Sequence, residues 1–127
     1  RKTFRTELND YKAKSEVVRS AEIYKGFAFA ICHGDGIESP TILGAQAANE
    51  LLNILGVRAS MVLTSYKGQT YVSARSIDEV NVQLIMEKLG GGGHANIAGV
   101  QLECSLEAAY AVIKQTIDEM IEEGELT

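Results

Sequence analysis

The sequence has 127 residues, is 46% hydrophobic and carries a net charge of −5, which suits one domain with an ordinary core. No apolar run approaches the roughly 18 residues of a membrane-spanning helix, and no signal-peptide pattern is present. Seven of the twelve Lys and Arg lie in residues 1–25, and seven of the seventeen acidic residues lie from Glu103 onward, which excludes a broad nucleic-acid-binding face. An anionic ligand is therefore expected to be held locally, by a few side chains and backbone amides.

The first half of the chain predicts a helix, a buried strand and a second helix. Apolar residues at helical spacing predict a helix over 4–23, which we interpret as a connector that packs on a neighbouring domain. Because the chain has no starting Met and opens in this stretch, we expect a fragment of a longer protein. The continuous apolar run 26–34 predicts a central strand covered on both faces. Ser39 followed by Pro40 predicts the start of a helix that extends to about Leu55, with Leu55 on its buried stripe.

The second half predicts a hairpin, a helix, another strand and a last helix. The elements are strands 57–66 and 69–76, helix 80–89, strand 97–103 and a helix from Leu106. The order αβαββα, glycine loop, βα predicts an α/β fold, with a mixed sheet of about four to five strands flanked by helices. We expect one domain over 25–127, preceded by a connector helix over 1–24.

One strand of the hairpin places two polar residues on the same face. Val72 and Ala74 alternate with Ser73 and Arg75. If the apolar pair faces the core, Ser73 and Arg75 share the opposite face.

The glycine run Gly90 to Gly93, followed by His94, points to a binding function. One glycine after Leu89 is enough to end a helix, so four predict a loop that a ligand approaches closely. Free N–H groups of such a loop can cradle an anion, His94 adds a donor, and Arg75 can add a bidentate fork for phosphate. The spacing matches neither a P-loop nor a dinucleotide-binding fingerprint. A flexible loop with a surface histidine is the alternative.

The two cysteines predict no disulfide and no metal site. Cys32 and Cys104 lie in apolar, strand-like contexts typical of buried, reduced thiols. A metal site formed by these cysteines with His33 and His94 lacks the close ligand spacing of known zinc sites. We therefore predict no metal ion in this chain.

Three motifs together resemble a known family. SARS at 73–76, then NVQLIMEKL, then GGGGHANIAG resembles the DHH phosphoesterases, and more narrowly their DHH-associated C-terminal domain. The resemblance covers roughly residues 25–123 and is greatest to the GdpP-type cyclic di-AMP phosphodiesterases. It implies that Arg75 and Ser76 grip a phosphate, that Gly91, Gly92 and Gly93 form the close-approach loop, and that His94 hydrogen-bonds to the nucleotide.

The resemblance also implies what this chain lacks. In the family, a separate DHH domain carries two manganese ions, and the DHH-associated domain closes over the cleft and holds the substrate. The sequence contains no Asp-His-His triplet, so we expect no catalytic residue and no cofactor here, and no hydrolysis by this chain alone. The expected partners are a cyclic dinucleotide or short oligonucleotide and the DHH domain of the same parent chain, with a homodimer also compatible. The parent is expected to be membrane-anchored, with this domain cytoplasmic and out of contact with the membrane.

Two alternative functions stay open. One is a DHH-family exonuclease or nano-RNase acting on short oligonucleotides. The other is a non-catalytic nucleotide-binding or interaction module, in which the glycine run only links two elements.

Overall fold

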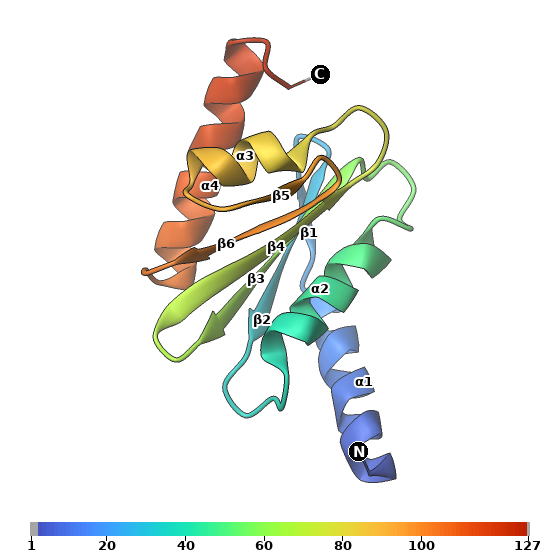
Figure 1. The fold of residues 1–127 in the computed structure, drawn as a ribbon. Coiled ribbons are helices and arrows are strands. Elements are labelled where there is room, and N and C mark those ends of the chain that lie inside the picture. The colour runs from blue at the N-terminus through green and yellow to red at the C-terminus, as the bar shows by residue number, and fades with distance from the viewer. Residues whose placement is uncertain (1–2, 127) are drawn as a thin grey trace.

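The computed structural model describes residues 3–126, which form a six-stranded sheet with helices on both faces (Figure 1). In chain order the elements are α1 (Phe4–Arg19), β1 (Glu22–Tyr24), β2 (Phe27–His33), α2 (Pro40–Leu51), β3 (Ala59–Tyr66), β4 (Gln69–Ser76), α3 (Val82–Lys88), β5 (Gly92–His94), β6 (Ile97–Leu102) and α4 (Leu106–Glu122). The sheet order is β1-β2-β3-β4-β6-β5, in which β2 and β3 are parallel and the other pairs antiparallel. The predicted α/β class with a mixed sheet is confirmed.

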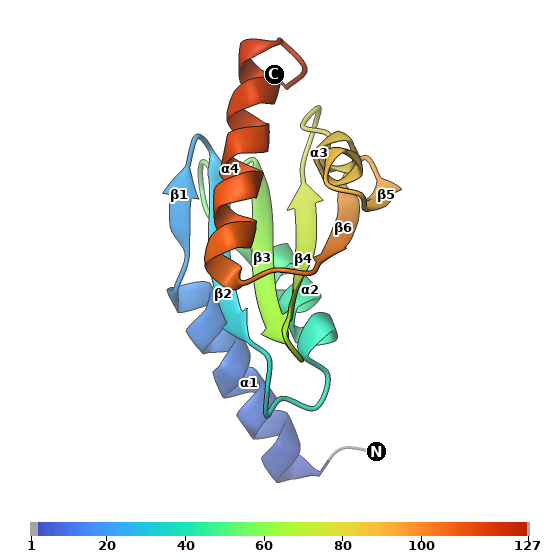
Figure 2. The same ribbon diagram turned by 90° about the vertical axis from the view of Figure 1, so that its left-hand side faces the viewer.

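The sheet separates two hydrophobic cores. On one side α1 and α2 pack over Ala28, Ala30 and Cys32 of β2, and on the other side α3 and α4 pack over the remaining core (Figure 2). Phe27 and Phe29 belong to this second core, so β2 is buried on both faces as its apolar run predicted. The α4 residues Ala109, Ile113, Ile117 and Met120 recur at helical spacing and are all buried.

The strand count is six rather than four to five, because two three-residue strands were not predicted. Residues 22–24, expected at the end of the first helix, form β1 and pair with Phe27–Phe29. Residues 92–94, expected in a glycine loop, form β5 and pair with Ile97–Gly99. Glycine has low β-propensity, so a run of four glycines predicts a loop rather than a strand.

The second helix ends earlier than predicted. α2 stops at Leu51, and Leu55 is fully exposed rather than part of a buried stripe. Gly56, at φ +89°, lies in the turn that leads to Val57 and β3. Ser39 occupies the N-cap position as predicted, but its side chain makes no capping hydrogen bond.

α1 packs on the domain through its C-terminal half. Val17 is buried against α2 and β2, whereas Phe4, Leu8 and Tyr11 are 82%, 42% and 65% exposed. No helix within residues 3–126 is long and apolar enough to cross a membrane. The connector role of α1 stays a prediction.

Candidate functional site

The first two glycines of the run end α3. Gly90 has φ +95° and its N–H donates to the Glu87 carbonyl at 3.1 Å, while the N–H of Gly91 donates to the Met86 carbonyl at 2.8 Å. This pair of bonds is a Schellman motif, in which a left-handed residue closes the last helical turn. Both N–H groups are therefore used by the helix end, so they do not form part of an anion cradle.

Gly91, just before β5, and Gly93, within β5, both lie close to β6. A Cβ on Gly91 would lie 2.6 Å from Val100 Cβ, and a Cβ on Gly93 would lie 2.6 Å from Ala98 Cα. Gly93 also has φ +141°, which side chains rarely adopt. At these two positions the close approach is made by the neighbouring strand of the same domain.

Gly92 differs from its neighbours. A Cβ on Gly92 would meet no atom within 4 Å, and its φ lies outside the left-handed region. The fold therefore gives no reason for a glycine at this position, whereas a ligand that lies against the main chain would give one.

Gly92 and His94 share a face of the sheet with Arg75. The register places Arg75 beside Ile97 and Ile97 beside His94, while Ser73, Gly99 and Gly92 form the next row. We call these six residues the open face. They lie on the α2 side of the sheet, where Ile97 is 56% exposed. The prediction that Ser73 and Arg75 lie opposite the core-facing Val72 and Ala74 is confirmed.

Arg75 is a half-buried cation that has no counterion among residues 3–126. Its Nε donates to Asn49 Oδ1 at 3.0 Å, and its Nη1 donates to the Ala74 carbonyl at 2.9 Å. Burial lowers the pKa of Arg75, and within residues 3–126 this guanidinium makes no ion pair with a carboxylate. Over the same residues its Nη2 makes no hydrogen bond, and a partly desolvated cation of this kind favours an anionic ligand.

Ser76 lies away from the open face. It is 5% exposed, its Oγ donates to the Val80 carbonyl at 2.6 Å, and the same Oγ accepts from Asn96 Nδ2 at 2.9 Å. The Ser76 N–H also donates to the Asn96 carbonyl at 3.1 Å. These bonds join the end of β4 to the 95–96 turn, and the predicted phosphate contact of Ser76 stays a prediction.

Helix α3 is capped by Asn81, whose Oδ1 accepts from the Leu84 N–H at 3.3 Å. Asn81 therefore occupies the N-cap position of α3 and satisfies one of the N–H groups at the helix start.

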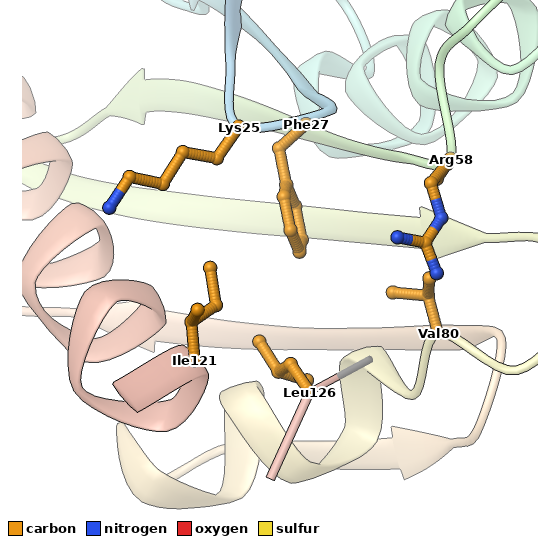
Figure 3. A pocket seen from close by; sticks show the side chains of 6 residues that line it. All are labelled: Lys25, Phe27, Arg58, Val80, Ile121 and Leu126. Carbon is orange, nitrogen blue, oxygen red and sulfur yellow. The ribbon is translucent and has the colours of Figure 1, made fainter. Parts of the chain in front are cut away.

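A cavity of about 220 Å³ lies on the other side of the sheet (Figure 3). Two cations stand beside it, but Lys25 pairs with Asp118 at 2.7 Å and Arg58 pairs with Glu79 at 3.7 Å. Its other lining residues are apolar: Phe27, Val80, Ile121 and Leu126. Because both cations already have acidic partners, charge favours the open face as the site for a phosphate.

The cysteines and histidines do not form a metal site. Cys32 is buried, Cys104 is half-buried, and neither forms a disulfide. Among residues 3–126, no group of three or more His, Cys, Asp and Glu side chains lies close enough to hold a metal ion.

Comparison with known proteins identifies the family. Residues 27–123 match the DHHA1 domain, so the chain belongs to this domain family. It is 44% identical, over 99 residues, to the cyclic-di-AMP phosphodiesterase PdeA of Listeria monocytogenes serotype 1/2a (strain 10403S), an alignment that covers 76% of this chain and 15% of that protein. It is 36% identical, over 126 residues, to the cyclic-di-AMP phosphodiesterase GdpP of Geobacillus thermodenitrificans (strain NG80-2), which covers 97% of this chain and 19% of that protein. The chain thus spans less than a fifth of the length of these relatives, and the predicted resemblance is confirmed.

Solved structures share the fold. An exopolyphosphatase-related protein from Bacteroides fragilis superposes with a TM-score of 0.76 at 20% identity, covering 87% of this chain and 34% of that one. RecJ from Thermus thermophilus in complex with Mn²⁺ superposes with a TM-score of 0.60 at 14% identity, covering 94% of this chain and 17% of that one. At these identities the likeness shows the fold alone.

Proposed function

We propose that this chain is the substrate-binding domain of a larger, manganese-dependent phosphodiesterase that hydrolyses cyclic di-AMP to a linear dinucleotide. The DHHA1 family and the names of the relatives support the class of substrate. The observation that carries the proposal is Arg75, half-buried, without a counterion in the described part of the chain, and on the same face as Gly92 and His94.

In this proposal the chain positions the phosphodiester and leaves the chemistry to the DHH domain. The Nη2 donors of Arg75 bind a phosphate oxygen, Gly92 lets the nucleotide lie against the main chain, and His94 hydrogen-bonds to the phosphate or the sugar. Two manganese ions held by the DHH domain would supply the activation of water and the stabilisation of displaced oxygens, since residues 3–126 offer no ligand set for them. Holding the reacting group in place can contribute several kcal/mol toward lowering the barrier.

The proposal is tested by hydrolysis of cyclic di-AMP in the intact parent protein with manganese. Arg75→Ala is compared with Arg58→Ala, which removes an arginine that already pairs with Glu79. Loss of a charge-assisted hydrogen bond costs about 1.5–3 kcal/mol, so we expect Arg75→Ala to lower kcat/KM by roughly 13- to 160-fold and Arg58→Ala to leave it unchanged.

Three results would overturn the proposal. Normal turnover by Arg75→Ala would show that the open face does not hold the substrate. Faster cleavage of short oligonucleotides than of cyclic di-AMP would favour the exonuclease alternative, and failure of any nucleotide to bind the parent would favour an interaction module.

We also propose that α1 packs on the preceding domain of the parent. Phe4, Leu8 and Tyr11 recur at i, i+4 and i+7, which places them on one side of the helix, and all three are exposed. A stripe of this kind is typical of an amphipathic helix with a partner on its apolar side.

A further inference from the structure

The Arg75 guanidinium is held by a neutral residue from another element. Asn49 lies on the exposed side of α2, and its Oδ1 accepts from Arg75 Nε at 3.0 Å. A carboxylate at this distance would neutralise the cation, whereas an amide oxygen fixes its orientation and leaves the positive charge for a ligand. Asn49 thus orients the guanidinium of Arg75 without neutralising its positive charge.

Two contacts hold α2 at the right distance for this bond. The buried Ser60 Oγ donates to the carbonyl of Ala48, the residue before Asn49, at 2.7 Å. Ser60 is also the register partner of Arg75, so the same point of the sheet fixes both ends of the contact. Near the start of the helix, Gly44 lies so close to the sheet that a Cβ there would be 2.6 Å from Thr64 Oγ1.

The remaining donors of Arg75 are consequently presented in a fixed plane. Nε is held by Asn49 and Nη1 by the Ala74 carbonyl, which restrains the planar guanidinium at two atoms. A long side chain that is already ordered loses less conformational entropy when a ligand binds.

We infer that Asn49 is a positioning residue, which orients Arg75 for a phosphodiester and thereby sets the affinity of the open face for that group. This inference rests on the proposed function, because Arg75 is its assumed anion contact.

The test is a titration of the 127-residue chain, which has its own two cores, with cyclic di-AMP, followed by NMR. The Arg75 Nε–H signal reports the Asn49 bond directly. We expect this signal to exchange faster with solvent in Asn49→Ala than in the unaltered chain. A net hydrogen bond is worth about 0.5–1.5 kcal/mol, so affinity should fall by roughly 2- to 13-fold.

Two further variants separate positioning from structural support. Asn49→Asp should weaken binding more than Asn49→Ala does, because the new carboxylate competes with the phosphate for Arg75. In an Arg75→Lys background, Asn49→Ala should have no further effect, because lysine has no Nε–H to orient. Gln46→Ala, an exposed change one turn earlier on α2, is the control and should bind as the unaltered chain does.

The outcomes distinguish the inference from the function on which it rests. Unchanged affinity in both Asn49 variants, with binding lost in Arg75→Ala, would overturn the role of Asn49 and leave the proposed function standing. Unchanged affinity in Arg75→Ala would overturn the proposed use of this face. Absence of binding by the unaltered chain at millimolar cyclic di-AMP would overturn the inference that Asn49 sets the affinity of this face, and the hydrolysis assay of the intact parent would then decide the proposed function.

Discussion

Gly92 pairs with Gly99 across the β5–β6 hairpin, and the two glycines differ in what an added methyl group would meet. At Gly99 a Cβ would lie 2.8 Å from the Val72 carbonyl oxygen, whereas at Gly92 it would meet nothing within 4 Å. The fold therefore requires Gly99 to be small and tolerates a larger residue at Gly92. This contrast separates the glycines that serve the hairpin from the one that the proposed ligand would need.

We expect Gly92→Ala to preserve the fold and to weaken binding. Replacing glycine by alanine at a permitted φ stabilises a protein by about 0.4–1 kcal/mol, through the unfolded state. The added methyl group would stand where the nucleotide approaches the main chain, so affinity for cyclic di-AMP should fall at least about tenfold. Thermal unfolding and a binding titration of the same sample measure the two effects, and unchanged affinity would argue against a contact at Gly92.

Gly91→Ala, in contrast to Gly92→Ala, should lower the stability of the fold. Its Cβ would be forced to within 2.6 Å of Val100 Cβ, and also against the Gly99 carbonyl oxygen, which is main chain and cannot rotate away. Overpacking of this kind costs about 1–3 kcal/mol, so the midpoint of thermal unfolding should fall relative to Gly92→Ala. Equal stability of the two variants would contradict the close approach of Gly91 to β6.

The sequence predicted secondary structure well where a regular apolar pattern extended over many residues, and it failed to predict the three-residue strands. Strand 69–76 was predicted with the bounds that the structure shows, because Val72 and Ala74 alternate regularly with polar residues. The glycine run has no such alternation, so the sequence does not predict the short strand β5. All four glycines were instead explained by the approach of a ligand to the main chain. Much of that glycine content is explained by the α3 cap and the β5–β6 contact, which depend on residues outside the run.

Ser76→Ala tests whether Ser76 acts on the fold or on the ligand. Its hydroxyl joins the Val80 carbonyl and Asn96 Nδ2 in a buried position, and leaving such partners unsatisfied costs about 1–3 kcal/mol. We expect lower stability with nearly unchanged affinity in the folded protein. Ser73→Ala, on the open face, is the matched control and should retain stability. Loss of affinity at unchanged stability in Ser76→Ala would instead support the phosphate contact predicted from the sequence.

Stability at extreme pH should depend on a surface cluster between β1 and α4. Hydrogen bonds from Lys25 and Tyr24 lower the pKa of Asp118 below its ordinary 3.8, and Asp118 raises the pKa of Tyr24 above 10.0 and that of Lys25 above 10.5. The nearby Lys114 also favours the ionised form of Asp118. The carboxylate therefore contributes stability above pH 3.8 that is lost as the pH falls through its lowered pKa. Tyr24 and Lys25 contribute stability below their ordinary values that is lost as the pH rises through their raised pKa values.

Asp118→Asn measures this contribution. The difference in unfolding free energy between the unaltered chain and Asp118→Asn should be constant at neutral pH and shrink at both extremes. Glu122→Gln, which removes a carboxylate at the exposed end of α4, is the control. A difference that does not vary with pH would contradict the coupling of these three groups.

Asn49 marks the limit of what the sequence could provide about the site. Arg75 and His94 were found from motifs that lie within 20 residues of each other, whereas Asn49 meets Arg75 from 26 residues away, on a different element. Nothing in the helical pattern of 40–51 distinguishes Asn49 from its exposed neighbour Glu50. Contacts of this kind follow from the packing of α2 on β3, which only the folded structure displays.

The most direct test of the central claim is a titration of the chain with cyclic di-AMP in which every backbone amide is followed by NMR. We predict shift changes concentrated at Arg75, Gly92, His94 and Ile97, and their loss in Arg75→Ala. Changes concentrated instead around Lys25, Arg58 and Val80, at the cavity on the other side of the sheet, would contradict the assignment of the phosphate site to the open face.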